Sequence, residues 1–159
     1  QWELVENQRG ITYYKLFGPY LAGAKKIVVE DAYVRKPYQL RNLAEFLEML
    51  LRCKNPDEDV AVHLVTGHNE PEFVDAQLNG LNELASTFSQ LGVNLTYEFR
   101  DTLHDRSITS DTGWEILPGR GLDIFQKFVD GDWLNPLLRH QQLRRVKECK
   151  VTYRRISEK

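Results

Sequence analysis

The spacing of apolar residues along the chain changes several times, and it predicts helices in three places. Between Pro37 and Cys53, apolar side chains recur every three or four positions, which predicts a helix with one buried face. The same spacing runs from residue 69 to Gly92 and predicts a second long helix. Residues 11–21 follow it as well, but Gly18 and Pro19 predict an interruption there.

Strand-like segments alternate with these helices. The short apolar run within residues 25–34 predicts a buried strand, and residues 60–67 are apolar enough to predict a strand covered on both faces. Residues 93–100 alternate as a half-buried strand does, and residues 114–117 predict another strand that leads into a turn. This order predicts an α/β fold with a mostly parallel central sheet flanked by helices.

Composition sets the limits of what this fold can be. The chain has 159 residues, of which 42% are hydrophobic and 28% charged, as expected for a single globular domain spanning residues 1–159. No apolar run reaches the length of a membrane span, so we expect any membrane contact to be peripheral. The first residue is Gln1, and we expect the chain to be a module of a longer protein. Cys53 and Cys149 have neither zinc-site nor disulfide spacing, which predicts reduced cysteines, a cytoplasmic setting, no metal and no cofactor.

The formal net charge of -2 conceals a cluster of positive charge near the carboxyl end. Residues 144–159 contain seven basic residues against two acidic ones. We call Arg144, Arg145, Lys147 and Lys150 the basic stripe. Such a stripe is either a solvated face or a surface attracted to phosphate groups, and charge alone does not separate lipid from nucleic acid.

Polar residues gather where the predicted strands end. The segments 30–35 (EDAYVR), 66–70 (TGHNE) and 104–111 (HDRSITSD) each follow a predicted strand, and ligands of α/β sheets bind at such ends. In residues 119–121 (GRG), two glycines flank an arginine, which offers a planar fork to phosphate or simply lies exposed in a turn.

Three of these motifs, EDAYVR, LHDRSITSDTGW and GRGLDIF, occur in an order and at spacings that resemble a known family. It is the family of phospholipase D-like domains that end the MIT-domain-containing proteins of ESCRT-III-dependent cytokinesis, which has prokaryotic relatives. The similarity extends from about Tyr14 through KECKVTYRR. It implies a phospholipase D-like fold, a carboxyl-terminal position in a longer protein, dimerisation, binding of acidic phospholipids and no need for catalysis.

The wider phospholipase D superfamily has the motif His-x-Lys-x4-Asp, which corresponds here to His104, Arg106 and Asp111. The resemblance implies that His104 is the candidate nucleophile and that a cation holds the phosphoryl oxygens. No second copy of the motif follows, because neither His63, His68 nor His140 has the required neighbours. A dimer supplies the missing histidine in single-motif relatives. We therefore expect a non-catalytic module, with a dimeric phosphodiesterase acting on nucleic acid or lipid as the alternative.

Several site residues have two interpretations. His104 either contacts phosphate or pairs with Asp105 or Asp111, and Asp111 is equally a good turn residue. His63 is interpreted as a satisfied core histidine. Trp133, in a loop-like context, could meet a membrane interface. We expect a structural network near the site that includes the following residues: Glu30, Asp31, Arg35, Arg106, Arg120 and Asp123.

The leading hypothesis is a peripheral membrane module that binds phosphoinositide or other acidic headgroups. The residues expected to bind phosphate are Arg106, Arg120, Arg144, Arg145, Lys147 and Lys150. We also expect a homodimer and recruitment of membrane-remodelling or other partner proteins through an amino-terminal domain. A nucleic-acid-binding module and a dimerisation scaffold in a prokaryotic protein remain open as alternatives.

Overall fold

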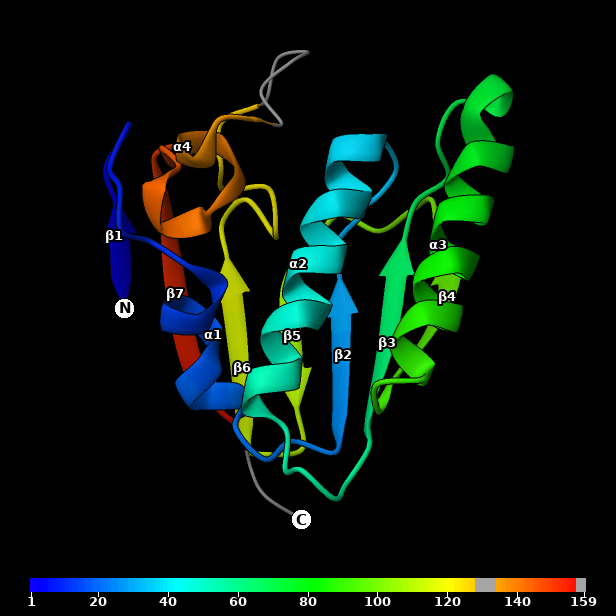
Figure 1. Ribbon diagram of the computed structural model, residues 1–159, viewed down its shortest axis with the longest axis horizontal. Helices are drawn as coiled ribbons and strands as arrows, with labels where there is room; N and C mark the ends of the chain where they lie inside the picture. The colour runs from blue at the N-terminus through cyan, green and yellow to red at the C-terminus, as the bar shows by residue number, and fades with distance from the viewer. Residues whose placement is uncertain (128–133, 157–159) are drawn as a thin grey trace.

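One seven-stranded sheet, in the order β1-β7-β6-β5-β2-β3-β4, organises the computed structural model, which describes residues 1–127 and 134–156 (Figure 1). Its strands are β1 (Trp2–Leu4), β2 (Lys26–Glu30), β3 (Val60–Thr66), β4 (Val93–Phe99), β5 (Ser107–Ser110), β6 (Trp114–Pro118) and β7 (Cys149–Arg155). The helices are α1 (Tyr13–Leu21), α2 (Pro37–Cys53), α3 (Val74–Ser89) and α4 (Pro136–Arg139), with the 3₁₀ turns η1 (Pro71–Phe73) and η3 (Gln141–Leu143).

The sheet is mixed, so the prediction of a mostly parallel sheet was wrong, although the α/β class is correct. Only β2–β3 and β3–β4 pair in parallel, and these strands are connected through α2 and α3. The pairs β2–β5, β5–β6, β6–β7 and β1–β7 are antiparallel. The links around β5 are too short for a crossover helix, and a short link can only reverse the chain direction.

Helices α1, α2 and α3 lie on one face of the sheet, and the described residues place no helix on the other face (Figure 1). The burial of β3 alternates near its start, with Ala61 exposed and His63 half-buried. The prediction that this strand is covered on both faces was therefore wrong. His63 is not a core histidine: its ring bonds Thr96 at 2.7 Å and Glu98 at 2.8 Å on the helix-free face.

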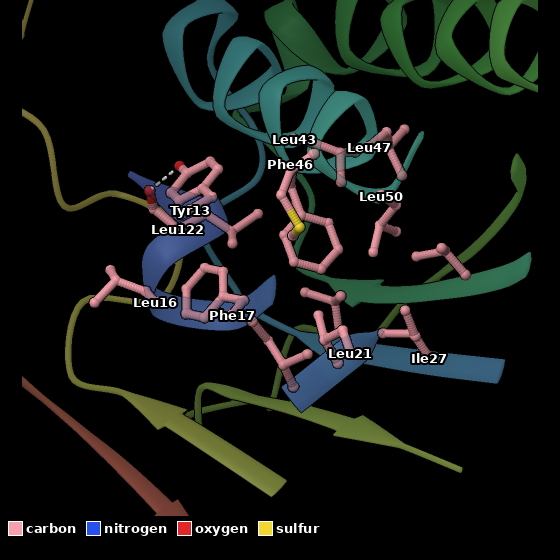
Figure 2. Close-up of a cluster of buried hydrophobic side chains, with 14 of the residues drawn as sticks. Tyr13, Leu16, Phe17, Leu21, Ile27, Leu43, Phe46, Leu47, Leu50 and Leu122 are labelled. Carbon is pink, nitrogen blue, oxygen red and sulfur yellow. Dashed lines mark hydrogen bonds between the residues drawn. The ribbon is translucent and has the colours of Figure 1, made fainter. Parts of the chain in front are cut away.

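The core fills the space between the sheet and α1 and α2 (Figure 2). Helix α2 occupies the predicted range Pro37–Cys53 and buries Leu43, Phe46, Leu47 and Leu50, which are spaced as a helix face requires. From α1, Tyr13 and Phe17 stack with ring centroids 5.5 Å apart. The buried Tyr13 hydroxyl donates a hydrogen bond to the Leu122 carbonyl, which ties the core to the segment after β6 (Figure 2).

Helix α1 continues through Gly18 and Pro19, where an interruption was predicted. Its buried side chains Tyr13, Leu16, Phe17 and Leu21 pack into the core, so tertiary burial outweighs the local cost of the proline. A Cβ at Gly18 would lie 3.2 Å from Tyr14 and 3.5 Å from the Cys53 sulfur, which makes a glycine suitable at this close approach to α2.

Strands β1 and β7, near the two ends of the chain, pair side by side and run in opposite directions. Strand β1 runs toward the upper edge in Figure 1, so its first residue lies at the lower end of the strand. Strand β7 ends at the lower edge. No described helix is both long and apolar enough to cross a bilayer.

Candidate functional site

Three loops meet at the upper edge of the sheet, where β2, β3 and β4 end and α2 and α3 begin (Figure 1). Backbone hydrogen bonds join them: Asp31 N donates to Val65 O at 3.0 Å, Gly67 N to Ala32 O at 3.2 Å, and Arg100 N to Thr66 O at 2.8 Å. The expected meeting of these strand-end segments is thus present. We call this part of the molecule the strand-end edge.

A buried carboxylate anchors the strand-end edge. Asp31 is only 2% exposed and accepts hydrogen bonds from the backbone nitrogens of Tyr33 at 2.9 Å and Leu122 at 3.1 Å. The Arg106 Nε atom lies 3.9 Å from Asp31 Oδ1. Burial raises the pKa of Asp31, while the two hydrogen bonds and Arg106 act in the opposite direction. The expected contact of Asp31 with Arg106 is formed.

The turn at residues 119–121 packs closely against this carboxylate. Gly121 has a φ of 61°, and a Cβ there would stand 2.1 Å from Asp31 Oδ2. Any other residue would displace the carboxylate or the turn. Arg120 is exposed, and its Nε donates to the Glu148 carbonyl at 2.9 Å, so it points toward the start of β7. The Glu30 side chain makes no hydrogen bond or ion pair among the described residues, so only part of the expected network forms.

Two guanidinium groups lie over one exposed ring at this edge. The Cζ atoms of Arg35 and Arg106 lie 4.9 and 4.7 Å from the ring centroid of Tyr33, which is 47% exposed. Arg35 Nε donates to the Ala32 carbonyl at 2.6 Å. Within the described structure, the terminal nitrogens of both guanidinium groups make no hydrogen bond to the protein. We call Tyr33, Arg35 and Arg106 the arginine–tyrosine cluster.

Residues Tyr33 and Lys36 were missed as site residues in the sequence. Lys36 is exposed beside Arg35 and precedes α2. An aromatic residue among charges directly after a buried strand was the available signal, because loops held by a rigid scaffold often carry binding residues. The partner of Tyr33, however, is Arg106, which is 73 residues away in the chain and joins it only through the β2–β5 pairing.

The histidine and aspartate of the sequence motif lie at opposite ends of β5. His104 precedes this strand at the strand-end edge; it is exposed and has no hydrogen bond among the described residues. Asp111 follows the strand and accepts hydrogen bonds from the backbone nitrogen of Lys25 at 3.0 and 3.3 Å. The suggested pairing of His104 with Asp111 is therefore wrong, and Asp111 closes a turn.

A different histidine is oriented by a carboxylate at this edge. The His68 Nδ1 atom lies 2.9 Å from Asp101 Oδ2, and its ring stacks on Phe99 with centroids 4.0 Å apart. The backbone N–H of His68 also donates to Asp101, and it lowers the pKa of that carboxyl more than the ring does. His140 is exposed after α4, outside the strand-end edge.

The basic stripe does not present a uniform charged face. Arg144 is 4% exposed, its Nη1 lies 3.0 Å from Glu45 Oε1, and its Cζ lies 4.5 Å from the ring centroid of Phe125. Because Arg144 is buried and paired with Glu45, it offers no charge to the surface, and burial lowers the pKa of its guanidinium. Lys147 is half-buried and pairs with Asp123 at 3.0 Å.

The other two stripe residues are exposed. Arg145 forms no ion pair within the described residues, and Lys150 lies 3.8 Å from Glu3 across the β1–β7 pair. Both precede or begin β7, whose start lies at the same upper edge as the arginine–tyrosine cluster (Figure 1). Trp133 lies outside the described residues.

No group of three or more His, Cys, Asp or Glu side chains in residues 1–127 and 134–156 is arranged to hold a metal ion. Cys53 and Cys149 are free, and burial raises the pKa of both thiols, which disfavours the reactive thiolate. The chemistry of the strand-end edge is therefore that of its guanidinium groups, imidazoles and aromatic rings.

Comparison with known proteins agrees with this architecture. Residues 10–155 match the family described as a phospholipase D-like domain at the C-terminus of MIT. The chain is 37% identical over 128 residues to MIT domain-containing protein 1 of Mus musculus, and the match covers 80% of this chain and 51% of the mouse protein. The chain thus spans about half the length of this curated relative.

Proposed function

Because the chain belongs to the family of phospholipase D-like domains at the C-terminus of MIT, we propose that it is a non-catalytic module that binds acidic phospholipid headgroups, phosphoinositides among them. Its place of action is the cytoplasmic face of a membrane, to which it attaches peripherally. In a longer protein, it would bring partner proteins held by another domain to that surface. The binding site is the strand-end edge.

The observation that carries this proposal is the arginine–tyrosine cluster. The Nε atoms of Arg35 and Arg106 face the Ala32 carbonyl and Asp31, while the terminal nitrogens make no hydrogen bond among the described residues. A guanidinium fixed in this way presents a planar fork of donors that matches two phosphate oxygens. Stacking on Tyr33 holds both side chains in place before a ligand arrives, which reduces the entropy cost of binding.

Neighbouring cations add to the attraction. Lys36 lies next in the chain to Arg35, and the amino end of α2 contributes a partial positive charge. Arg120, Arg145 and Lys150 are exposed and border the end of β6 and the start of β7 at the same edge. Near an anionic leaflet each such side chain contributes about 1 kcal/mol, so several together suffice for reversible attachment.

Co-sedimentation with liposomes tests this proposal. We expect binding to vesicles that contain phosphatidylinositol phosphates, no binding to neutral vesicles, and marked weakening when salt is raised to physiological strength. Arg35→Gln, Lys36→Gln and Arg106→Gln should each weaken binding about fivefold, the equivalent of one surface cation.

Arg154→Gln is the matched control, because Arg154 is 65% exposed but belongs to the lower part of β7, where it pairs with Glu115. Binding that is equal on charged and neutral vesicles, or equal losses in Arg154→Gln and the three edge variants, would contradict the proposal. If the chain instead bound single-stranded or duplex nucleic acid in a salt-sensitive way and did not bind vesicles, the ligand of this site would be a sugar-phosphate backbone.

A phosphodiesterase is the second candidate, and the His68–Asp101 pair favours it. An imidazole whose Nδ1 faces a carboxylate is oriented as a general base or nucleophile requires, and His104 and two guanidinium groups lie at the same edge. Hydrolysis of bis(p-nitrophenyl) phosphate that is lost in both His68→Ala and His104→Ala would support this candidate. An absence of turnover in the unmodified chain supports the binding module.

A further inference from the structure

An apolar groove adjoins the arginine–tyrosine cluster. It lies between the first turns of α2 and α3 and has a volume of about 720 Å³, within the range of sites that bind organic ligands. Its apolar wall is formed by Pro37, Tyr38, Leu40, Phe73 and Ala76. Phe73 is 51% exposed, so a large apolar ring is left in contact with water at the mouth.

The groove is built before any ligand enters. Gln77 on α3 is 1% exposed, and its side-chain nitrogen donates to the carbonyls of Val34 and Gly67, both at 3.0 Å. Its side-chain oxygen accepts a hydrogen bond from the Asn69 backbone at 2.8 Å. One buried amide therefore fixes the loops after β2 and β3 against α3, and the two walls keep their separation.

Positive charge stands at the mouth of the groove. Arg35 and Lys36 line it, and Lys127 Nζ lies 5.0 Å from the ring centroid of Tyr38. Glu70 is the acidic residue of the lining. Arg35 belongs both to the groove and to the arginine–tyrosine cluster, so the apolar wall and the phosphate site form one continuous surface.

We propose that the groove takes one acyl chain of an acidic phospholipid whose phosphate is bound by Arg35 and Lys36. This proposal rests on the proposed function and deepens it, because it makes the ligand a lipid rather than a free headgroup. Charge complementarity selects the occupant: an anionic head meets the cations at the mouth, and the chain meets the apolar wall. An acyl chain also needs no hydrogen-bond partners, whereas the helical walls offer few to a peptide backbone.

The test compares two soluble ligands by calorimetry with the unmodified chain: a dioctanoyl phosphatidylinositol phosphate and the matching inositol phosphate, which lacks the chains. Burial of even part of one octanoyl chain should make the lipid bind at least about tenfold more tightly than the headgroup. Ala76→Trp, which fills the groove from its exposed wall, should abolish that difference and leave headgroup binding unchanged. Phe73→Ser should reduce the difference.

Leu91→Ser is the matched control for Phe73→Ser, because Leu91 is 49% exposed but follows the opposite end of α3. Equal binding of lipid and headgroup, or an unchanged difference in Ala76→Trp, would overturn the acyl-chain proposal and leave the headgroup-binding function standing. If neither ligand bound, both proposals would be overturned. Saturable binding of an acidic amphipathic peptide without binding of the lipid would assign the groove to a protein ligand.

Discussion

At the scale of single residues, the site depends on a buried carboxylate whose observed partners belong to the protein. Asp31 is buried, receives two backbone hydrogen bonds and holds Arg106, while Gly121 leaves it the necessary room. From the sequence we expected Asp31 to belong to a structural network of charged residues near the site. The structure assigns Asp31 to the positioning of a cation that belongs to the protein itself.

The pH dependence of stability should report this contact. Burial raises the pKa of Asp31 in the folded state, so its contribution to stability is present below the unfolded pKa and is lost as pH rises through the folded pKa. Arg106→Gln removes a charge that lowers this pKa, so the folded pKa should rise further. Urea unfolding should therefore give a loss of about 1 kcal/mol at neutral pH and a smaller loss near pH 4.

Arg154→Gln again serves as the control, since its partner Glu115 lies far from Asp31 in the sheet. A loss in Arg106→Gln that is the same at both pH values would mean that Arg106 acts on stability without influencing the ionisation of Asp31.

At the scale of secondary-structure elements, periodicity was a good guide where burial is one-sided and local. Helix α2 begins and ends where the spacing of its leucines and Phe46 predicts, and β4 alternates as predicted. The same reasoning failed for β3, because an apolar run does not reveal whether a second layer of helices exists to cover it. It also gave no strand at Trp2–Leu4 or Cys149–Arg155, which are stabilised by pairing between opposite ends of the chain.

The site was predictable in its location but not in its composition. Strand-end segments were expected to converge, and they do, because parallel strands end at one edge. The sequence did not predict that Tyr33, Arg35 and Arg106 lie together, because their proximity depends on β5 lying antiparallel beside β2. The burial of Arg144 was not predictable either, because its partner Glu45 lies on α2, far away in the sequence.

The start of α2 should link helix stability to ligand binding. Gln39 Oε1 accepts hydrogen bonds from the backbone nitrogens of Arg35 at 3.1 Å and Lys36 at 3.0 Å. Gln39→Ala should lower the free energy of unfolding by about 1 kcal/mol, because it leaves both donors without this partner. The variant should also bind acidic vesicles more weakly, since the backbone of both cations loses its restraint.

Gln39→Glu retains acceptor oxygens at the same position and is the matched comparison for unfolding by urea. A stability change in Gln39→Ala with unaltered vesicle binding would separate the cap from the site.

At the scale of the whole molecule, two parts of the sheet are accessible to other molecules: its helix-free face and its edge strand β4. Its helix-free face carries polar side chains such as His63 and Thr96, and β4 is a seven-residue edge strand. An edge strand of this length offers unpaired backbone groups to another chain. The family resemblance implies a dimer, and we expect β4 to form its interface.

Sedimentation equilibrium tests this expectation. We expect a mass that rises with concentration toward twice the 18.6 kDa of the chain. A proline at Thr96, in the middle of β4, should favour the monomer because it removes a backbone donor and breaks an extended edge. A mass that stays at one chain throughout would rule out both the dimer and any active site shared between two copies.

The direction of β1 has a consequence for how a longer protein would sit on a membrane. Strand β1 runs toward the strand-end edge, and the N-terminus lies at the flank of the sheet, below that edge and at about the middle of the domain (Figure 1). A domain joined at this point would stand beside the module, on its β1 flank, and not between the strand-end edge and the headgroups. The module would then hold such a neighbouring domain at its side, close to the membrane surface.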